Sequence, residues 1–117
     1  MVLNAAKLGA PLDGVVSFHG GLQGVPPSKS IVTSKILVLN GEADPFVPAQ
    51  DIANFRKQMD SASVPYTFKN YPGALHAFTN PEADEYAKKF KMSVAYNEAA
   101  DKNSWSDMKA FFADLWK

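Results

Sequence analysis

The chain has 117 residues, and its 12 lysines and arginines balance its 12 aspartates and glutamates, so the formal net charge is zero. With 46% hydrophobic and 21% charged residues, it has the composition of a single globular domain, and the lack of excess positive charge argues against nucleic acid or a polybasic membrane surface as partner. There is no cysteine, which excludes disulfides and thiol catalysis, and the longest aliphatic run, Ile36–Leu39, is far short of the ~20 residues that cross a bilayer.

Glycine- and proline-rich stretches divide the chain into short ordered segments. The first segment is rich in alanine and leucine and lacks the features of a secretory signal, so we expect a cytoplasmic protein that begins with a helix. The expected elements are, in chain order, a helix over 2–8 that stops before Gly9 and Pro11, a strand over Gly14–Phe18, a connection over His19–Ser34, a strand over Lys35–Asn40, a helix from Pro48 to about Ser61, a strand over Pro65–Tyr71, partly helical structure over Glu82–Ala100, and a helix over 105–116.

Two of these helices are predicted from apolar side chains at helical spacing. At the start of the second of these helices, a pair of polar residues resembles a helix cap. The first stripe is Ile52, Phe55 and Met59; the second is Trp105, Met108, Phe112 and Leu115, with Ser104 and Asp107 as the capping pair.

The strand–helix–strand order from Lys35 to Tyr71 predicts a parallel pair with a right-handed crossover. Lys35–Asn40 is apolar at consecutive positions, which is typical of a strand covered on both faces. We therefore expect an α/β architecture of about three parallel strands with flanking helices.

Ligands of open parallel sheets bind beyond the carboxyl ends of the strands, so the residues that follow each strand are the candidates for a site. His19 follows the first strand, Asp44 the second and His76 the third. A carboxylate that accepts the histidine Nδ1–H fixes the tautomer and stabilises the imidazolium, which makes the other ring nitrogen a general base. Asp44 and His76 are therefore a candidate acid–base pair.

Structural roles for these residues stay open at this point. Asp44 alone would cap the turn before Pro45, and His76 would then be a half-buried loop histidine. His19 stands beside two glycines and is more typical of packing than of catalysis. A metal site of His19, Asp44 and His76 matches no short ligand motif, so no metal is expected.

Four segments carry a resemblance to a known family. They are DGVVSFHGGL (13–22), KILVLNGEADPFVP (35–48), YPGALHAF (71–78) and AYNEAADKNSWSDMKAFF (95–112). Together they resemble the dienelactone hydrolase family of α/β-hydrolases. The resemblance implies that Asp44 in a G-x-x-D loop is the orienting acid and that His76 in a G-x-x-H-x-F loop is the general base. It also implies a small ester or lactone substrate and no cofactor, with Phe46 and Phe78 as apolar walls of the substrate site.

The nucleophile of that family is missing. It occupies a turn of pattern G-x-C-x-G or G-x-S-x-G before the helix that corresponds to residues 2–8, and the 117 residues contain neither pattern. Residues 1–117 are thus expected to be a single partial domain, the C-terminal half of a truncated α/β-hydrolase fold that is inactive alone. Two alternatives remain: one half of a split hydrolase that another chain completes, and a non-enzymatic binding or assembly module.

The resemblance also affects the expected sheet. The nucleophile-bearing strand of the family is the direct neighbour of the strand that corresponds to Gly14–Phe18. Without that neighbour, this strand is an apolar edge that favours pairing with another chain. Self-association through Gly14–Phe18 is therefore expected, by edge pairing or by exchange of the terminal helix.

Overall fold

A computed structural model describes residues 1–30 and 32–117; Ile31, within the expected connection, lies outside the described residues. The three strands form one parallel sheet of order β1-β2-β3, as the sequence predicts. The elements are α1 (Val2–Lys7), β1 (Gly14–Phe18), β2 (Lys35–Gly41), α2 (Ala49–Ser61), β3 (Thr67–Tyr71), α3 (Ala83–Phe90) and α4 (Glu98–Leu115).

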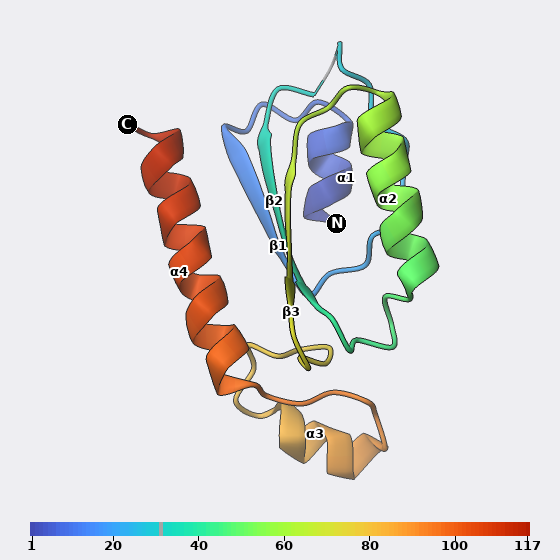
Figure 1. Cartoon of the computed structure of the whole chain (residues 1–117), viewed down its shortest axis with the longest axis vertical. Helices are drawn as coiled ribbons and strands as arrows, with labels where there is room; N and C mark the ends of the chain where they lie inside the picture. The colour runs from blue at the N-terminus through green and yellow to red at the C-terminus, as the bar shows by residue number, and fades with distance from the viewer. Residues whose placement is uncertain (31) are drawn as a thin grey trace.

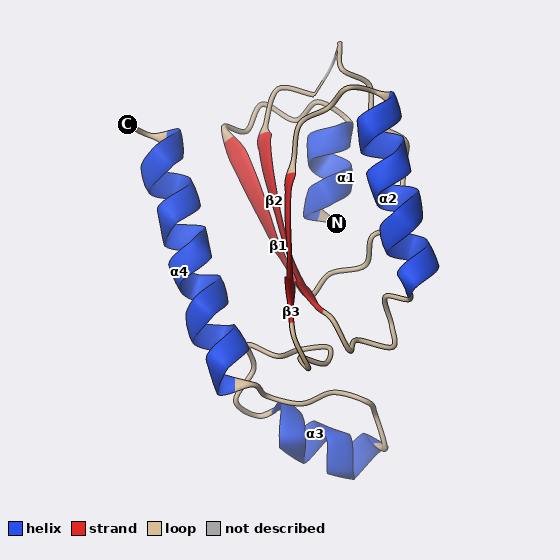
Figure 2. Ribbon diagram, in the orientation of Figure 1, coloured by secondary structure: helices blue, strands red, loops and turns tan. Residues whose placement is uncertain are grey.

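The sheet is the middle of three layers. Helices α1 and α2 cover one face and α4 covers the other, while α3 lies beyond the carboxyl ends of the strands (Figure 1). The central strand β2 is buried from Ile36 to Gly41, because helices cover both of its faces. Figure 2 shows the strands running side by side toward the end of the molecule where α3 lies.

Each face of the sheet has its own core. The core under α1 and α2 is centred on Val38, Phe55 and Met59, which include two of the three residues of the predicted α2 stripe; the third, Ile52, is half-buried against them. The core under α4 is formed by Leu37, Leu39, Tyr71, Ala74, Phe78 and Ala100. Alternate β2 residues thus belong to opposite cores, as the two-residue period of a strand requires.

The prediction for the start of the last helix is wrong. Helix α4 begins at Glu98, and the side chain of Asn97 caps it by accepting the amide N–H of Ala100 at 3.0 Å. Ser104 is inside the helix, fully buried, and its hydroxyl donates to the carbonyl of Asp101 at 2.9 Å. The buried residues of the first turns of α4 are the small Ala100 and Ser104. The apolar stripe that starts at Trp105 therefore begins well after the start of the helix.

Two smaller boundaries also differ from the predictions. Pro48 is the residue before α2 rather than its first residue, and β3 begins at Thr67 instead of Pro65. A proline has no N–H to donate to a ladder, which keeps Pro65 outside the strand. Within the residues described, no helix is both long and apolar enough to cross a membrane.

Candidate active site

The loops after β2 and β3 are joined by backbone hydrogen bonds. The amide of Glu42 donates to the carbonyl of Tyr71, and the amide of Ala43 donates to that of Ala74, each at 3.0 Å. A Cβ atom at Gly41 would lie 2.5 Å from the carbonyl oxygen of Ala74, so only glycine allows this approach. Backbone hydrogen bonds and this close approach therefore fix the loops of Asp44 and His76 relative to each other.

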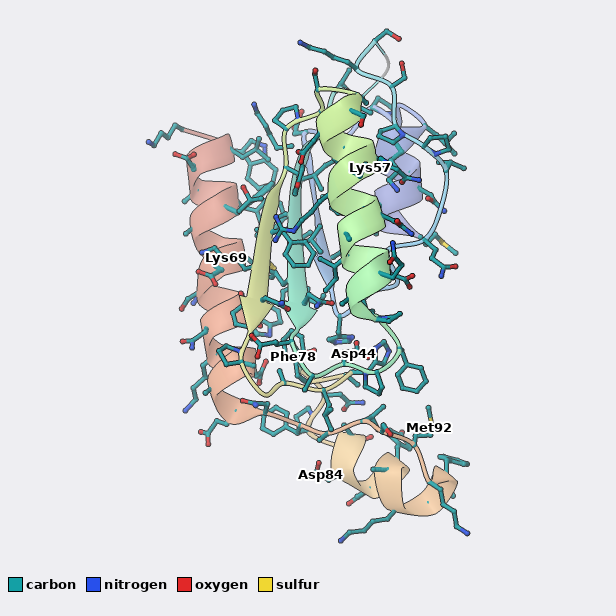
Figure 3. The ribbon with its side chains drawn as sticks, turned by 45° about the vertical axis from the view of Figure 1, so that its right-hand side comes forward. Asp44, Lys57, Lys69, Phe78, Asp84 and Met92 are labelled. Atoms are coloured by element: carbon teal, nitrogen blue, oxygen red, sulfur yellow. The ribbon has the colours of Figure 1, made fainter. Side chains whose placement is uncertain are left out.

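The candidate acid and base meet as predicted. His76 Nδ1 lies 2.8 Å from Asp44 Oδ2, within hydrogen-bonding distance. The Asp44 side chain is fully buried, whereas about a third of the His76 side chain is exposed. Asp44 and Phe78 lie together below the carboxyl ends of the strands (Figure 3).

The two carboxylate oxygens of Asp44 make different contacts. Its Oδ1 accepts the amide N–H of Phe46 at 2.8 Å, which is the expected cap of the turn, and its Oδ2 remains for His76. The turn is closed further by the amide of Val47, which donates to the carbonyl of Asp44 at 3.2 Å. Because both carboxylate oxygens are engaged, the orientation of the acid is fixed before any ligand binds.

The backbone around His76 is also anchored. The amide of Ala95 donates to the carbonyl of His76 at 3.3 Å, and Ala77, the next residue, has a positive φ of 62°. A carboxylate only accepts hydrogen bonds, so the bond to Asp44 places the imidazole proton on Nδ1 and leaves Nε2 as an acceptor. The arrangement suits removal of a proton from a group that approaches Nε2.

His19 completes a cluster of rings. Its ring meets that of His76 edge-on, with centroids 5.5 Å apart, and its Nε2 lies 2.9 Å from Thr79 Oγ1. Burial lowers the pKa of His19 below its ordinary value of 6.5, and the neighbouring His76 lowers it further. His19 therefore favours the neutral form and adds no positive charge beside His76.

The two phenylalanines occupy different environments. Phe46 is 51% exposed, and its ring lies 5.1 Å from that of His76, so it offers an apolar surface at the pair. Phe78 is fully buried, packed edge-on against His19 with centroids 5.2 Å apart. This burial does not fit the expectation that Phe78 lines a substrate site. Phe78 instead belongs to the core under α4 and packs against His19.

Two features of the site were not predictable from the sequence: the contact of Thr79 with His19 and the role of Gly41. No sequence motif marks Thr79, because it contacts His19 only when the loop after β3 folds under the sheet. Gly41 was visible as the first residue of the G-x-x-D pattern, but its contact with the β3 loop needed the structure. In residues 1–30 and 32–117, no group of three or more histidine, aspartate or glutamate side chains converges as metal ligands.

One hollow of the described residues is separate from the acid–base pair. It has a volume of about 700 Å³ and lies between α4 and the first residues of β2 and β3. Its lining includes Lys35, Tyr66 and Phe111, but neither Asp44 nor His76. The acid–base pair therefore lies outside this hollow.

The chain is similar in sequence to known proteins. The sequence profile of the dienelactone hydrolase family matches residues 1–116. An uncharacterised protein from Caenorhabditis elegans is 29% identical over 104 residues, covering 87% of this chain and 64% of the relative.

Two solved structures are similar in both sequence and fold. A dienelactone hydrolase-like promiscuous phosphotriesterase from metagenomic libraries is 30% identical, with a TM-score of 0.81. A protein designated m3DLH is 29% identical, with a TM-score of 0.81. Each match covers 94% of this chain but 45% of the solved one, so the chain spans about half the length of these relatives. The family match over nearly every residue shows that the chain belongs to the dienelactone hydrolase family.

Proposed function

We propose that this chain supplies the acid and the general base of a carboxylic ester or lactone hydrolase. The observation that carries the proposal is the 2.8 Å contact between His76 Nδ1 and the buried Oδ2 of Asp44. The family match supports the chemistry, because it extends over both loops of the pair.

In this proposal, His76 Nε2 removes the proton of an attacking hydroxyl or thiol. Asp44 stabilises the imidazolium that forms, and the same proton is later given to the leaving alcohol. Phe46 provides an apolar surface beside the reacting bond. His19 holds the His76 ring in place by edge-on contact, and Phe78 packs against His19.

The nucleophile of the proposed reaction comes from residues outside the 117. The chain has no G-x-C-x-G or G-x-S-x-G pattern, and it spans less than half of the solved relatives. The nucleophile would belong either to a further segment of the same polypeptide or to a second chain. The 117 residues alone are then expected to show no ester turnover.

A non-enzymatic module is the alternative function. It would use the same fold as a binding or assembly domain, and Asp44 and His76 would only stabilise the loops. The two functions differ in one outcome: an assembly module does not gain hydrolytic activity when a nucleophile is supplied.

Complementation tests the proposal. The chain is mixed with the separately purified part of the phosphotriesterase relative that lies outside the match, which covers 45% of that protein. Where mixing gives no complex, the two are joined in the order of the relative. The substrates are p-nitrophenyl acetate and, because that relative is described as a promiscuous phosphotriesterase, a neutral phosphate triester.

We expect the complex to hydrolyse the acetate ester faster than the sum of its parts. The matched control is His76→Gln, which keeps a polar side chain of similar size but cannot act as a base. A folded complex without turnover, or with turnover that His76→Gln leaves unchanged, would contradict the proposal.

A further inference from the structure

Two residues beside the acid–base pair have a left-handed backbone although they are not glycine. They are His19, with φ of 40°, and Ala77, with φ of 62°. The other two such residues in the described chain, Ser63 and Lys91, lie at the ends of helices α2 and α3, where a left-handed residue is common. His19 and Ala77 lie instead in the loops after β1 and β3, so contacts within the site have to hold them in this conformation.

The side chain of Thr79 binds the ring of His19. His19 Nε2 lies 2.9 Å from Thr79 Oγ1, and this bond joins the loop after β1 to the loop after β3. Phe78 packs edge-on against the same ring, with centroids 5.2 Å apart. Burial lowers the pKa of His19, so the ring favours its neutral form, with which a hydroxyl pairs as donor or as acceptor. Thr79 and Phe78 together thus fix the orientation of the His19 ring.

The His19 ring in turn contacts the imidazole of His76. The two rings meet edge-on, with centroids 5.5 Å apart. The torsion of an imidazole about its Cβ–Cγ bond is broad, so the single hydrogen bond from His76 to Asp44 restricts the tilt of the ring only in part. The contacts of His76 with His19 and with Phe46, whose ring centroid is 5.1 Å away, supply the remaining restriction.

The orientation of His76 matters because proton transfer depends on geometry. A general base needs its nitrogen within about 2.6–3.2 Å of the group that loses the proton, and a displacement of about 1 Å costs on the order of 10²-fold in rate. The contacts from Thr79 through His19 to His76 join the loops after β1 and β3, and Asp44 adds the loop after β2. All four residues belong to this chain, whichever segment supplies the nucleophile.

We propose that Thr79 and His19 are positioning residues for His76. The Thr79 hydroxyl fixes the His19 ring, and that ring holds the His76 imidazole in the orientation in which Nε2 takes a proton. Neither residue has to touch the substrate. The catalytic consequence rests on the proposed role of His76 as the base, whereas the orientation of its ring is a property of the 117-residue chain itself.

NMR of the 117-residue chain tests the orientation directly. Thr79→Val removes the hydroxyl at nearly constant volume, so the Overhauser contact between the His19 and His76 rings should be lost and the ring nitrogen signals of His76 should move. Thr79→Ser keeps the hydroxyl and should preserve both. The matched control is Thr67→Val on β3, which makes the same change at an exposed threonine and should leave the His76 signals in place.

Kinetics of the complemented enzyme tests the consequence. Thr79→Val should lower kcat about tenfold and leave KM unchanged, because it loosens the base without removing a contact to substrate. Thr79→Ser should restore most of the rate. In a His19→Ala background, Thr79→Val should have no further effect, since Thr79 acts through His19.

Circular dichroism shows whether each variant is folded. If Thr79→Val does not fold, His19→Phe breaks the same bond from the other side while it keeps an aromatic ring, and the same shift of the His76 signals is expected. A folded Thr79→Val chain that is less stable but keeps the contact between the rings would overturn the proposal, because the hydroxyl would then be structural only. So would a further loss of kcat in the His19→Ala background. An inactive complex contradicts the proposed function instead, and the NMR result still decides the orientation.

Discussion

The two edges of the sheet differ in how completely their polar groups are matched. On the β3 side, Lys69 Nζ and the hydroxyl of Tyr71 both donate to the carboxylate of Asp107, at 2.8 and 2.6 Å, which joins the strand to α4. Strand β1, like β3, has β2 as its single neighbour in the sheet of the described residues, and on its side α4 is joined by the longer bond of Trp116 Nε1 to Asp13, at 3.3 Å. The two sides therefore differ in how firmly side-chain hydrogen bonds join them to α4.

The same contrast holds for buried charge. Asp44 is buried with partners on both oxygens. Lys7 on α1, beside β1, is 1% exposed, and its Nζ has no hydrogen-bond partner among the residues described. Its contact is with the ring of Phe55, 5.4 Å away.

The first prediction concerns the acid–base pair in the complemented enzyme. Asp44→Asn should lower turnover about 10⁴-fold, because an amide in place of the carboxylate favours the wrong tautomer of the histidine. His76→Gln should lower it at least as much. The measurement is the initial rate with p-nitrophenyl acetate. A loss below tenfold for Asp44→Asn would mean that the buried pair only stabilises the loops.

The second prediction concerns the contact that joins the two site loops. Gly41→Ala should lower the free energy of unfolding by about 1–3 kcal/mol, because its Cβ would meet the carbonyl oxygens of Ala74 and Leu75 at 2.5 and 2.9 Å. Gly21→Ala is the control, since nothing lies within 4 Å of the Cβ position there. Urea unfolding measures both variants. Equal effects would show that the loops can move apart freely.

Sequence reasoning predicted the strands and the meeting of Asp44 with His76 because both follow from general rules. Apolar runs between glycine and proline turns mark strands, and parallel strands bring their following loops to one edge. The burial of Phe78 was not predictable, since it depends on the turn at Ala77 directing the chain under the sheet. The start of α4 was missed because its first residues, Glu98 to Lys102, carry little apolar signal.

The third prediction addresses Lys7. Lys7→Met should raise the free energy of unfolding by about 1–3 kcal/mol at neutral pH, because it removes a buried donor without a partner. Burial lowers the pKa of Lys7 from its ordinary value of 10.5, so the unfolded chain binds the proton more tightly. The penalty is therefore full at low pH and disappears as the pH rises through the lowered pKa toward 10.5.

Chemical unfolding at several pH values measures this difference. Exposed Lys57 on α2 provides the control, because Lys57→Met should change stability little. A destabilised Lys7→Met variant would show that the ammonium has a favourable role in the folded chain.

The smallest effect is expected at the β3 side. Asp107→Ala should lower the free energy of unfolding by about 1–2 kcal/mol, since it removes the hydrogen bonds from Lys69 and Tyr71. Burial alone would raise the pKa of Asp107, but these two bonds outweigh it and hold the pKa below 3.8. Its stabilisation is therefore present above pH 3.8 and is lost as the pH falls through the lowered pKa.

The matched control for Asp107 is the exposed ion pair of Lys102 with Glu98 on the same helix. Lys102→Ala should leave the unfolding midpoint unchanged within error, because both partners are solvated. Thermal unfolding compares the two variants. An equal shift of the two unfolding midpoints would show that the bonds of Asp107 stabilise the fold no more than an exposed ion pair does.

The most direct test of the central claim, that Asp44 orients His76 as a base, is the tautomer of the His76 ring. Nitrogen-15 NMR of the labelled chain at neutral pH reports it, with His19→Gln used to assign the signals. The proton is predicted on Nδ1, strongly hydrogen-bonded, with Nε2 bare, and Asp44→Asn should abolish that pattern. A proton on Nε2, or a spectrum that Asp44→Asn leaves unchanged, would contradict the account.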